Sequence, residues 1–302
     1  MTNETIDTTY PRGRAVLLLF VTAILWSTSG ILIKIIDWQP MSILAGRSAL
    51  AIGVFVIYLR NTKWRFNRVI ILGAVACCVT QLLYITSMKM TTAANAIFLQ
   101  YTGPIYVILL GALFLRERPT RTDWFTLVLI LAGLGFFFGD ELSLDGRIGN
   151  LLAILSGVTM AIMTVCLRSQ KDGSPGLAIL LAHIMGAVIG LPSMLRESFA
   201  LQNVAIMSFL GIVQIGIAFA LYSTAIKHVP ALEATLIVTL EPILNPLWVF
   251  LVIGEAPGPL ALLGGILVIG AVVARGLISA QSGAREASRR RRTTRPVKSG
   301  SP

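Results

Sequence analysis

A glutamate and two prolines stand inside an apolar stretch that is long enough to cross a membrane. The segment Leu240 to Pro257 reads LEPILNPLWVFLVIGEAP, with Glu241 followed by Pro242 and, one turn later, Pro246. A proline removes one backbone hydrogen bond of a helix, and in hydrocarbon the freed carbonyl group requires another polar partner. A carboxylate at mid-span costs on the order of 3 kcal/mol on insertion scales. We therefore expect a kinked helix that borders protein or a wet cavity.

Glu241 has two possible roles in such a place. It can accept or donate a structural hydrogen bond, or it can carry a coupling proton during a transport cycle. Asn245 lies one turn onward on the same side and could share that bond. The prolines Pro104, Pro242 and Pro246 are either hinges beside a cavity or packing kinks. The sequence leaves these alternatives open.

Arg47 is a cation well inside an apolar span, so it needs an acceptor. Its guanidinium group matches a carboxylate in a planar geometry with two hydrogen bonds, which makes the carboxylate of a solute a candidate partner. An ion pair with Glu241, or a contact with a carbonyl group freed by proline, is an equally open alternative.

Aromatic and amide side chains in the same spans could form the walls of a small-molecule pocket. Gln81 and Tyr84 are three residues apart and share a helix face. Aromatic walls with a few oriented polar groups are typical of small-molecule sites, although ordinary packing between helices also explains them. The predicted substrate-binding residues are Trp26, Arg47, Gln81, Tyr84, Asn95, Phe98, Tyr101, Thr102, Tyr222 and Thr239. Gln214 is a further candidate in the second half.

Long apolar runs must position these side chains. The chain has 302 residues, of which 55% are hydrophobic and 13% charged, whereas soluble proteins have about 25% charged residues. Each run is long enough to cross roughly 30 Å of hydrocarbon as a helix, and the alternation typical of a membrane barrel is absent. We predict an all-α integral membrane protein with ten transmembrane helices, over residues 15–36, 40–59, 69–88, 91–115, 122–138, 150–168, 177–195, 203–226, 231–253 and 259–279.

Basic residues gather on one side of this predicted topology. With the N-terminus inside, the inner loops hold Arg12, Arg14, Arg60, Lys63, Arg65, Arg68, Arg116, Arg118, Arg121, Arg168, Lys171, Lys227 and the C-terminal cluster. The outer loops hold Lys34, Lys89, Arg147 and Arg196. By the positive-inside rule both termini are cytoplasmic, and we expect a multi-pass protein of a bacterial inner membrane.

The basic tail and the cysteines have plain explanations. The tail from Arg285 to Pro302 carries most of the net charge of +11, and we expect it to lie near anionic lipid rather than to bind nucleic acid. The three cysteines lie inside spans, so a disulfide framework is not expected. We expect no metal site and no cofactor.

The chain repeats itself at an offset of 138 residues. Tyr84 matches Tyr222, Pro104 matches Pro242, and Glu117 matches Glu255. Five spans are an odd number, so the second copy is inverted relative to the first, an architecture that places a binding site at the midplane between the repeats. The expected division is a tail over 1–14, repeats over 15–138 and 150–279, and a basic tail over 280–302.

Two repeated patterns carry a family resemblance. NAIFLQYTGPIYVILLGALFLRERP in the first half and LEATLIVTLEPILNPLWVFLVIGEAP in the second resemble the paired EamA domains of the drug/metabolite transporter superfamily, as does ILWSTSGILIK near the start. The resemblance implies a ten-helix carrier, with helices one to four and six to nine around a central cavity. Many such carriers export amino acids and related metabolites.

The expected function is a secondary carrier that exports small metabolites, with amino acids as the first class, by alternating access. Drugs, nucleosides or purines are alternative solutes for the same fold. No GxxxxGK[ST] loop is present to bind ATP, and no HExxH motif or paired carboxylates suggest a membrane enzyme on lipid-linked substrates. A channel would normally show a ring of like groups. Proton coupling and the oligomeric state stay open.

Overall fold

The fold was analysed in a computed structural model, which describes residues 12–139, 146–244 and 258–293. Regular secondary structure in these residues is entirely helical. Six of the helices are long and apolar enough to cross a membrane by length and composition. The helical segments fall at the predicted places, with the ninth described only as far as residue 244, and the predicted all-α membrane fold is confirmed.

The first half contains five helical passes, several of them in consecutive pieces. In chain order they are α1 (Arg12–Trp26) with α2 (Ser29–Ile35), α3 (Pro40–Tyr58), α4 (Arg68–Met90), α5 (Ala93–Gln100) with α6 (Gly103–Leu110) and the π-helix η1 (Gly111–Leu115), and α7 (Arg121–Phe138).

The second half repeats this order. It contains α8 (Arg147–Ser169), α9 (Pro175–Met194), α10 (Leu201–Ser208) with the π-helix η2 (Phe209–Ile217) and α11 (Ala218–Ala225), then α12 (Ala231–Val238) followed by a helical turn at 241–244, and finally α14 (Pro259–Thr293).

Local sequence signals start several of these helices. The Asn67 side chain caps α4 by accepting a hydrogen bond from the backbone nitrogen of Ile70 at 2.8 Å. Thr120 and Asp123 form a reciprocal capping box at the start of α7. Such caps satisfy backbone N–H groups that have no partner within the helix.

Equivalent helices of the two halves run antiparallel. Gly176 at the start of α9 lies against Tyr58 at the end of α3, whereas Gly190 near the end of α9 lies against Met41 near the start of α3. The helices also exchange partners as a two-fold relation requires, because α1 packs on α11 while α8 packs on α4. The repeat is therefore inverted, as predicted.

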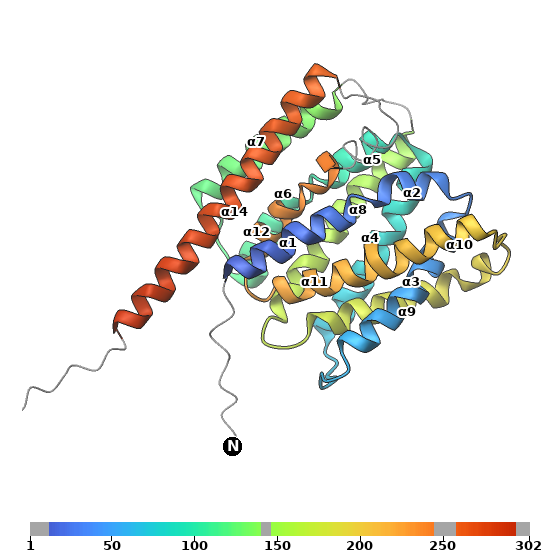
Figure 1. Ribbon diagram of the computed structural model, residues 1–302, viewed down its shortest axis with the longest axis horizontal. Helices are drawn as coiled ribbons and strands as arrows, with labels where there is room; N and C mark the ends of the chain where they lie inside the picture. The colour runs from blue at the N-terminus through green and yellow to red at the C-terminus, as the bar shows by residue number, and fades with distance from the viewer. Residues whose placement is uncertain (1–11, 140–145, 245–257, 294–302) are drawn as a thin grey trace, which may run out of the picture.

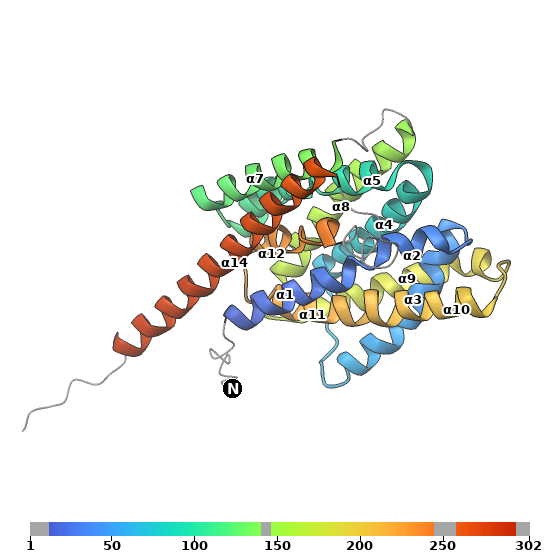
Figure 2. The same ribbon diagram turned by 45° about the horizontal axis from the view of Figure 1, so that its top comes forward.

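The fifth helices of both halves form an outer pair, in which α7 and α14 lie side by side (Figures 1 and 2). Gly264 lies against the backbone of Gly133 and Phe137, so the two helices approach closely at small residues. Small residues at a helix interface allow such approach in membranes. The other four passes of each half form the rest of the bundle.

The fourth pass of each half is broken at the same place in the repeat. The first break, at Tyr101 and Thr102, separates α5 from α6, and the second, at Thr239 and Leu240, follows α12. Pro104 lies in the first turn of α6, where a proline needs no helical N–H partner. The predicted kink is thus a break in both copies.

Candidate functional site

A cavity of about 70 Å³ lies between the two halves, beside both helix breaks. Its walls come from passes one to four of the first half and from α8, η2, α11 and the turn at 241–244 of the second. The lining residues are Trp26, Ser29, Arg47, Cys77, Thr80, Gln81, Tyr84, Gln100, Tyr101, Met160, Met163, Gln214, Ile215, Phe219 and Glu241.

The structure brings together several of the residues that the sequence predicts for the site. Those that line the cavity are Trp26, Arg47, Gln81, Tyr84, Tyr101 and Glu241. They come from four passes of the first half and one of the second. A cavity with aromatic walls and few polar groups has the composition of a small-molecule site.

Other predicted residues lie outside this cavity. The Tyr222 hydroxyl pairs with Thr164 at 3.2 Å, and its ring lies behind Trp26 with the ring centroids 5.3 Å apart. The hydroxyl groups of Thr102 and Thr239 donate to carbonyl oxygens of their own helices, at 2.7 and 3.0 Å. None of these three side chains lines the cavity.

The remaining predicted residues are found elsewhere. Asn95 bonds to Asn150 at 2.9 Å near the end of the bundle where α8 begins. Phe98, Pro104 and Pro242 do not line the cavity. Asn245 and Pro246 lie outside the described residues.

Buried polar atoms without a partner converge on the cavity. The donors are Trp26 Nε1 and Arg47 Nε, and the acceptors are the Oε1 atoms of Gln81 and Gln214. None of these atoms has a hydrogen bond to the described residues. A buried polar atom left unpaired costs about 1–3 kcal/mol, so an arrangement that collects several in one hollow suits water or a polar solute.

Glu241 lies at the junction of the two helix breaks. The Tyr101 hydroxyl donates a short hydrogen bond to its carboxylate and lies 3.3 Å from the carbonyl oxygen of Val238. A carboxyl group at the first turn of a helix is also favoured by the helix dipole. The Arg47–Glu241 ion pair is not formed. The guanidinium group of Arg47, a residue only 2% exposed, can therefore bind another partner.

Gln100 and Thr80 are lining residues that the predicted set lacks, and the second-half candidate Gln214 lines the cavity with them. Gln214 is placed by the π-helix η2, a form of helix that often marks functional positions. The residue type of Gln214 is the feature that points to it in the sequence, because a glutamine within an apolar span needs hydrogen-bond partners. The matching position in the first half is Ala76, so the repeat could not have found it.

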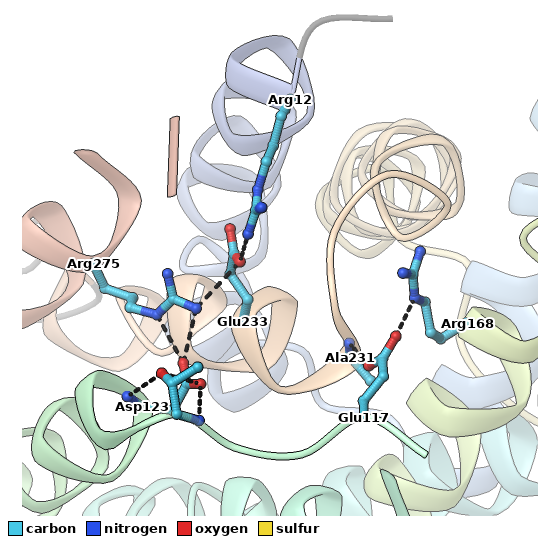
Figure 3. A network of polar contacts seen from close by, with 8 residues as sticks. Arg12, Glu117, Asp123, Arg168, Ala231, Glu233 and Arg275 are labelled. Carbon is cyan, nitrogen blue, oxygen red and sulfur yellow. Dashed lines mark hydrogen bonds and ion pairs between the residues drawn. The ribbon is translucent and has the colours of Figure 1, made fainter. Parts of the chain in front are cut away.

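Ion pairs close one end of the bundle, the end where α1 begins, which we name the N-terminal end (Figure 3). Glu233 accepts from Arg12 at 2.5 Å and from Arg275 at 3.3 Å, and Arg275 also reaches Asp123 at 2.8 Å. These residues border a second cavity of about 240 Å³. The network joins α1 and α7 of the first half to α12 and α14 of the second.

A second cluster lies at the same end. Glu117 accepts from Arg168 at 2.8 Å and from the backbone nitrogen of Ala231 at 2.9 Å, so it caps α12 as well (Figure 3). In the loop before α12, burial and the charges of Lys227 and Arg168 lower the pKa of His228. His228 therefore adds no charge to this end at neutral pH.

Comparison with known proteins gives these features a family. The model of the EamA-like transporter family matches the chain twice, over residues 13–139 and 147–275. The chain belongs to the EamA-like transporter family. The resemblance seen in the sequence is thereby confirmed, and the protein is a multi-pass membrane protein of a transporter family.

Relatives of this EamA-like chain include named exporters. It is 28% identical to the pseudopaline exporter CntI of Pseudomonas aeruginosa, covering 74% of this chain and 82% of the relative. It is 26% identical to the threonine/homoserine exporter RhtA of Escherichia coli, covering 64% of each chain. A crystal structure with 20% identity superposes with a TM-score of 0.74 over 87% of this chain and 98% of the other, which supports the fold.

Proposed function

We propose that this EamA-like protein is a secondary carrier that exports small zwitterionic metabolites, with amino acids as the substrate class, across a bacterial inner membrane. The solute binds in the cavity between the two halves, and the halves rock around it. In this proposal the two transport units are residues 15–138 and 150–279. The basic tail, 280–302, lies against anionic lipid.

The unpaired polar atoms in the cavity wall are the observation that carries the proposal. Arg47 supplies a buried cation and Trp26 an N–H donor, which together suit a carboxylate. Gln81 and Gln214 supply carbonyl oxygens, and Glu241 a carboxyl group, which suit an ammonium group. A solute with both charges and a modest side chain satisfies both sets at once.

The size of the cavity supports transport by alternating access. A cavity needs roughly 10–15 Å³ for each water molecule, so about 70 Å³ has room for several waters. An amino acid requires the walls to move apart. In carriers of this general architecture, broken helices at the interface of inverted halves form the solute site, and the halves rock around it.

The proposal also covers the orientation of the protein in the membrane, the direction of transport and the coupling to protons. The excess of Lys and Arg in the loops of the N-terminal end supports a cytoplasmic location for that end. Export is favoured because two relatives are named as exporters, one of them of threonine and homoserine. Glu241 is the proposed proton carrier, since it is an ionisable group that borders the cavity.

Counterflow in proteoliposomes tests the function. Vesicles are loaded with an unlabelled solute, and uptake of the labelled solute is followed for amino acids, nucleosides and cationic drugs. We expect exchange of one or more amino acids. Exchange of nucleosides or drugs alone favours the other solute classes, and failure of every solute to exchange removes the proposal.

A further inference from the structure

Two polar pairs at opposite ends of the bundle occupy equivalent places in the repeat. At the offset of 138 residues, Arg12 of α1 corresponds to Asn150 of α8, and Asn95 of α5 corresponds to Glu233 of α12. Arg12 contacts Glu233, and Asn150 contacts Asn95. Each pair therefore joins the first pass of one half to the fourth pass of the other, and the two-fold relation exchanges them.

The pair at the N-terminal end is ionic and buried. The Glu233 side chain is fully buried and receives Arg12 at 2.5 Å and Arg275 at 3.3 Å (Figure 3). Arg275 continues to Asp123, so two charges from each half meet at this end. The Glu117–Arg168 ion pair joins the halves a second time.

The pair at the opposite end is neutral. Asn95 donates from Nδ2 to the Asn150 Oδ1 atom at 2.9 Å, and the Thr91 hydroxyl donates to the same oxygen at 2.7 Å. Gly149 of α8 lies directly against Met90 and Thr91, so backbone contact reinforces the closure. Hydrogen bonds between neutral groups are roughly half as strong as those in which a partner is charged.

We propose that Arg12–Glu233 and Asn95–Asn150 are the two gates of the central cavity, equivalent in position and unequal in strength. This inference depends on the proposed carrier function. Both gates lie on the fourth passes, whose breaks border the cavity, so separation of either pair frees one end of a broken helix. The ionic gate holds the N-terminal end closed more firmly, and the unloaded carrier consequently opens at the opposite end first.

The exchange of gates between ends tests this inference. Cys77 lines the cavity, and the variants Cys78→Ser and Cys166→Ser leave it as the single thiol. The rate of its modification by a membrane-impermeant methanethiosulfonate is measured with reagent on either side of vesicles of known orientation. The ratio of the two rates reports which end is open.

The first variant makes the N-terminal gate neutral, with Arg12→Asn and Glu233→Asn; Arg275 then keeps Asp123 as its partner. We expect the ratio to shift at least about tenfold toward the N-terminal side. The second variant, Asn95→Glu with Asn150→Arg, places the ionic pair at the opposite end. We expect a shift of similar size in the reverse direction.

The single variant Arg12→Gln and a control complete the test. Arg12 is partly exposed, so Arg12→Gln should fold and shift the ratio in the same direction as the neutral gate, by a smaller factor. Arg118→Gln removes a charge from the wall of the second cavity, at the same end as Arg12 but outside the described ion pairs. It should leave the ratio of the two modification rates within about twofold. An unchanged ratio in Arg12→Gln and in both exchanges overturns the inference, as does an equal shift in Arg118→Gln.

Amino-acid counterflow in the same vesicles separates this result from the proposed function. Exchange of solute with unchanged ratios rejects the gates and keeps the carrier. Shifted ratios without exchange of any solute support the gates and reject the proposed solutes.

Discussion

Tyr101 and Glu241 join the two helix breaks across the interface between the halves. The Tyr101 hydroxyl belongs to the first break, and the Glu241 carboxylate begins the helical turn after the second. Because both groups also line the cavity, a solute bound there would contact both helix breaks. A change in charge at Glu241 therefore acts on both breaks together.

Removal of the charge at Glu241 should remove the pH dependence of exchange. Glu241→Gln keeps the size of the side chain and an oxygen that can accept from Tyr101, so we expect the fold and measurable exchange to persist. Counterflow rates measured from acidic to neutral pH check this. Tyr101→Phe is the control, because it breaks the hydrogen bond and leaves the ionisable group. A normal pH profile in Glu241→Gln would assign that residue to structure.

Arg47→Gln should weaken binding of an amino acid about ten- to a hundredfold, since a hydrogen bond to a charged group contributes about 1.5–3 kcal/mol. The matching amine without the carboxylate should be unaffected. Apparent affinities from competition in counterflow give both numbers. Arg47→Lys keeps the charge, and its affinity for the amino acid should lie between those of the unsubstituted protein and of Arg47→Gln. Equal loss for both solutes would place Arg47 in packing rather than in carboxylate binding.

Gln214→Leu should lower solute affinity without loss of stability. The Oε1 atom of Gln214 has no partner among the described residues, so its removal relieves an unpaired buried group. Melting temperatures in detergent, with and without solute, measure both effects. Gln81→Leu should behave alike. A variant that melts several degrees lower without solute would show that the glutamine serves the fold.

Aromatic residues at the cavity wall should matter more for binding than those behind it. Tyr84→Ala and Tyr101→Ala each remove a lining side chain, and we expect the apparent affinity to fall at least about tenfold. Tyr222→Phe is the control: it removes only the hydroxyl that pairs with Thr164 and keeps the ring behind Trp26. Normal affinity in both alanine variants would move the site elsewhere.

The outer helix pair should be sensitive to a single methyl group at Gly264. A Cβ atom there would press on the backbone of Gly133 and Phe137, and overpacking of this kind typically costs about 1–3 kcal/mol. We expect Gly264→Ala to lower the melting temperature in detergent by several degrees. Gly270→Ala in the same helix meets open space and should not lower it. Equal melting temperatures would contradict the observed packing.

The repeat in the sequence predicted that the fourth passes of the two halves are interrupted at matching places. The prolines at 104 and 242 indicated kinks at matching places, and the breaks before them were found in both copies. This worked because a proline acts on its own helix, through a hydrogen bond that it cannot make. No knowledge of neighbouring helices was needed.

The cavity wall was harder to predict because it depends on neighbours. The sequence predicted Asn95 and Tyr101 for the same pocket, yet six residues separate them, about 9 Å along a helix axis, and Asn95 reaches Asn150 at the end of the bundle. Tyr222 faces the interior but stands behind Trp26. Helix phase gives the direction of a side chain, whereas depth and the side chains in front of it come only from packing.

Protection of Cys77 by solute tests the central claim most directly, since this thiol lies in the wall of the proposed binding cavity. In the variant that lacks the other two cysteines, the rate of Cys77 modification is measured against the concentration of an amino acid that exchanges in counterflow. We predict saturable protection, which Arg47→Gln shifts to higher concentration. Full exchange without any protection of Cys77 would contradict a solute site between the two halves.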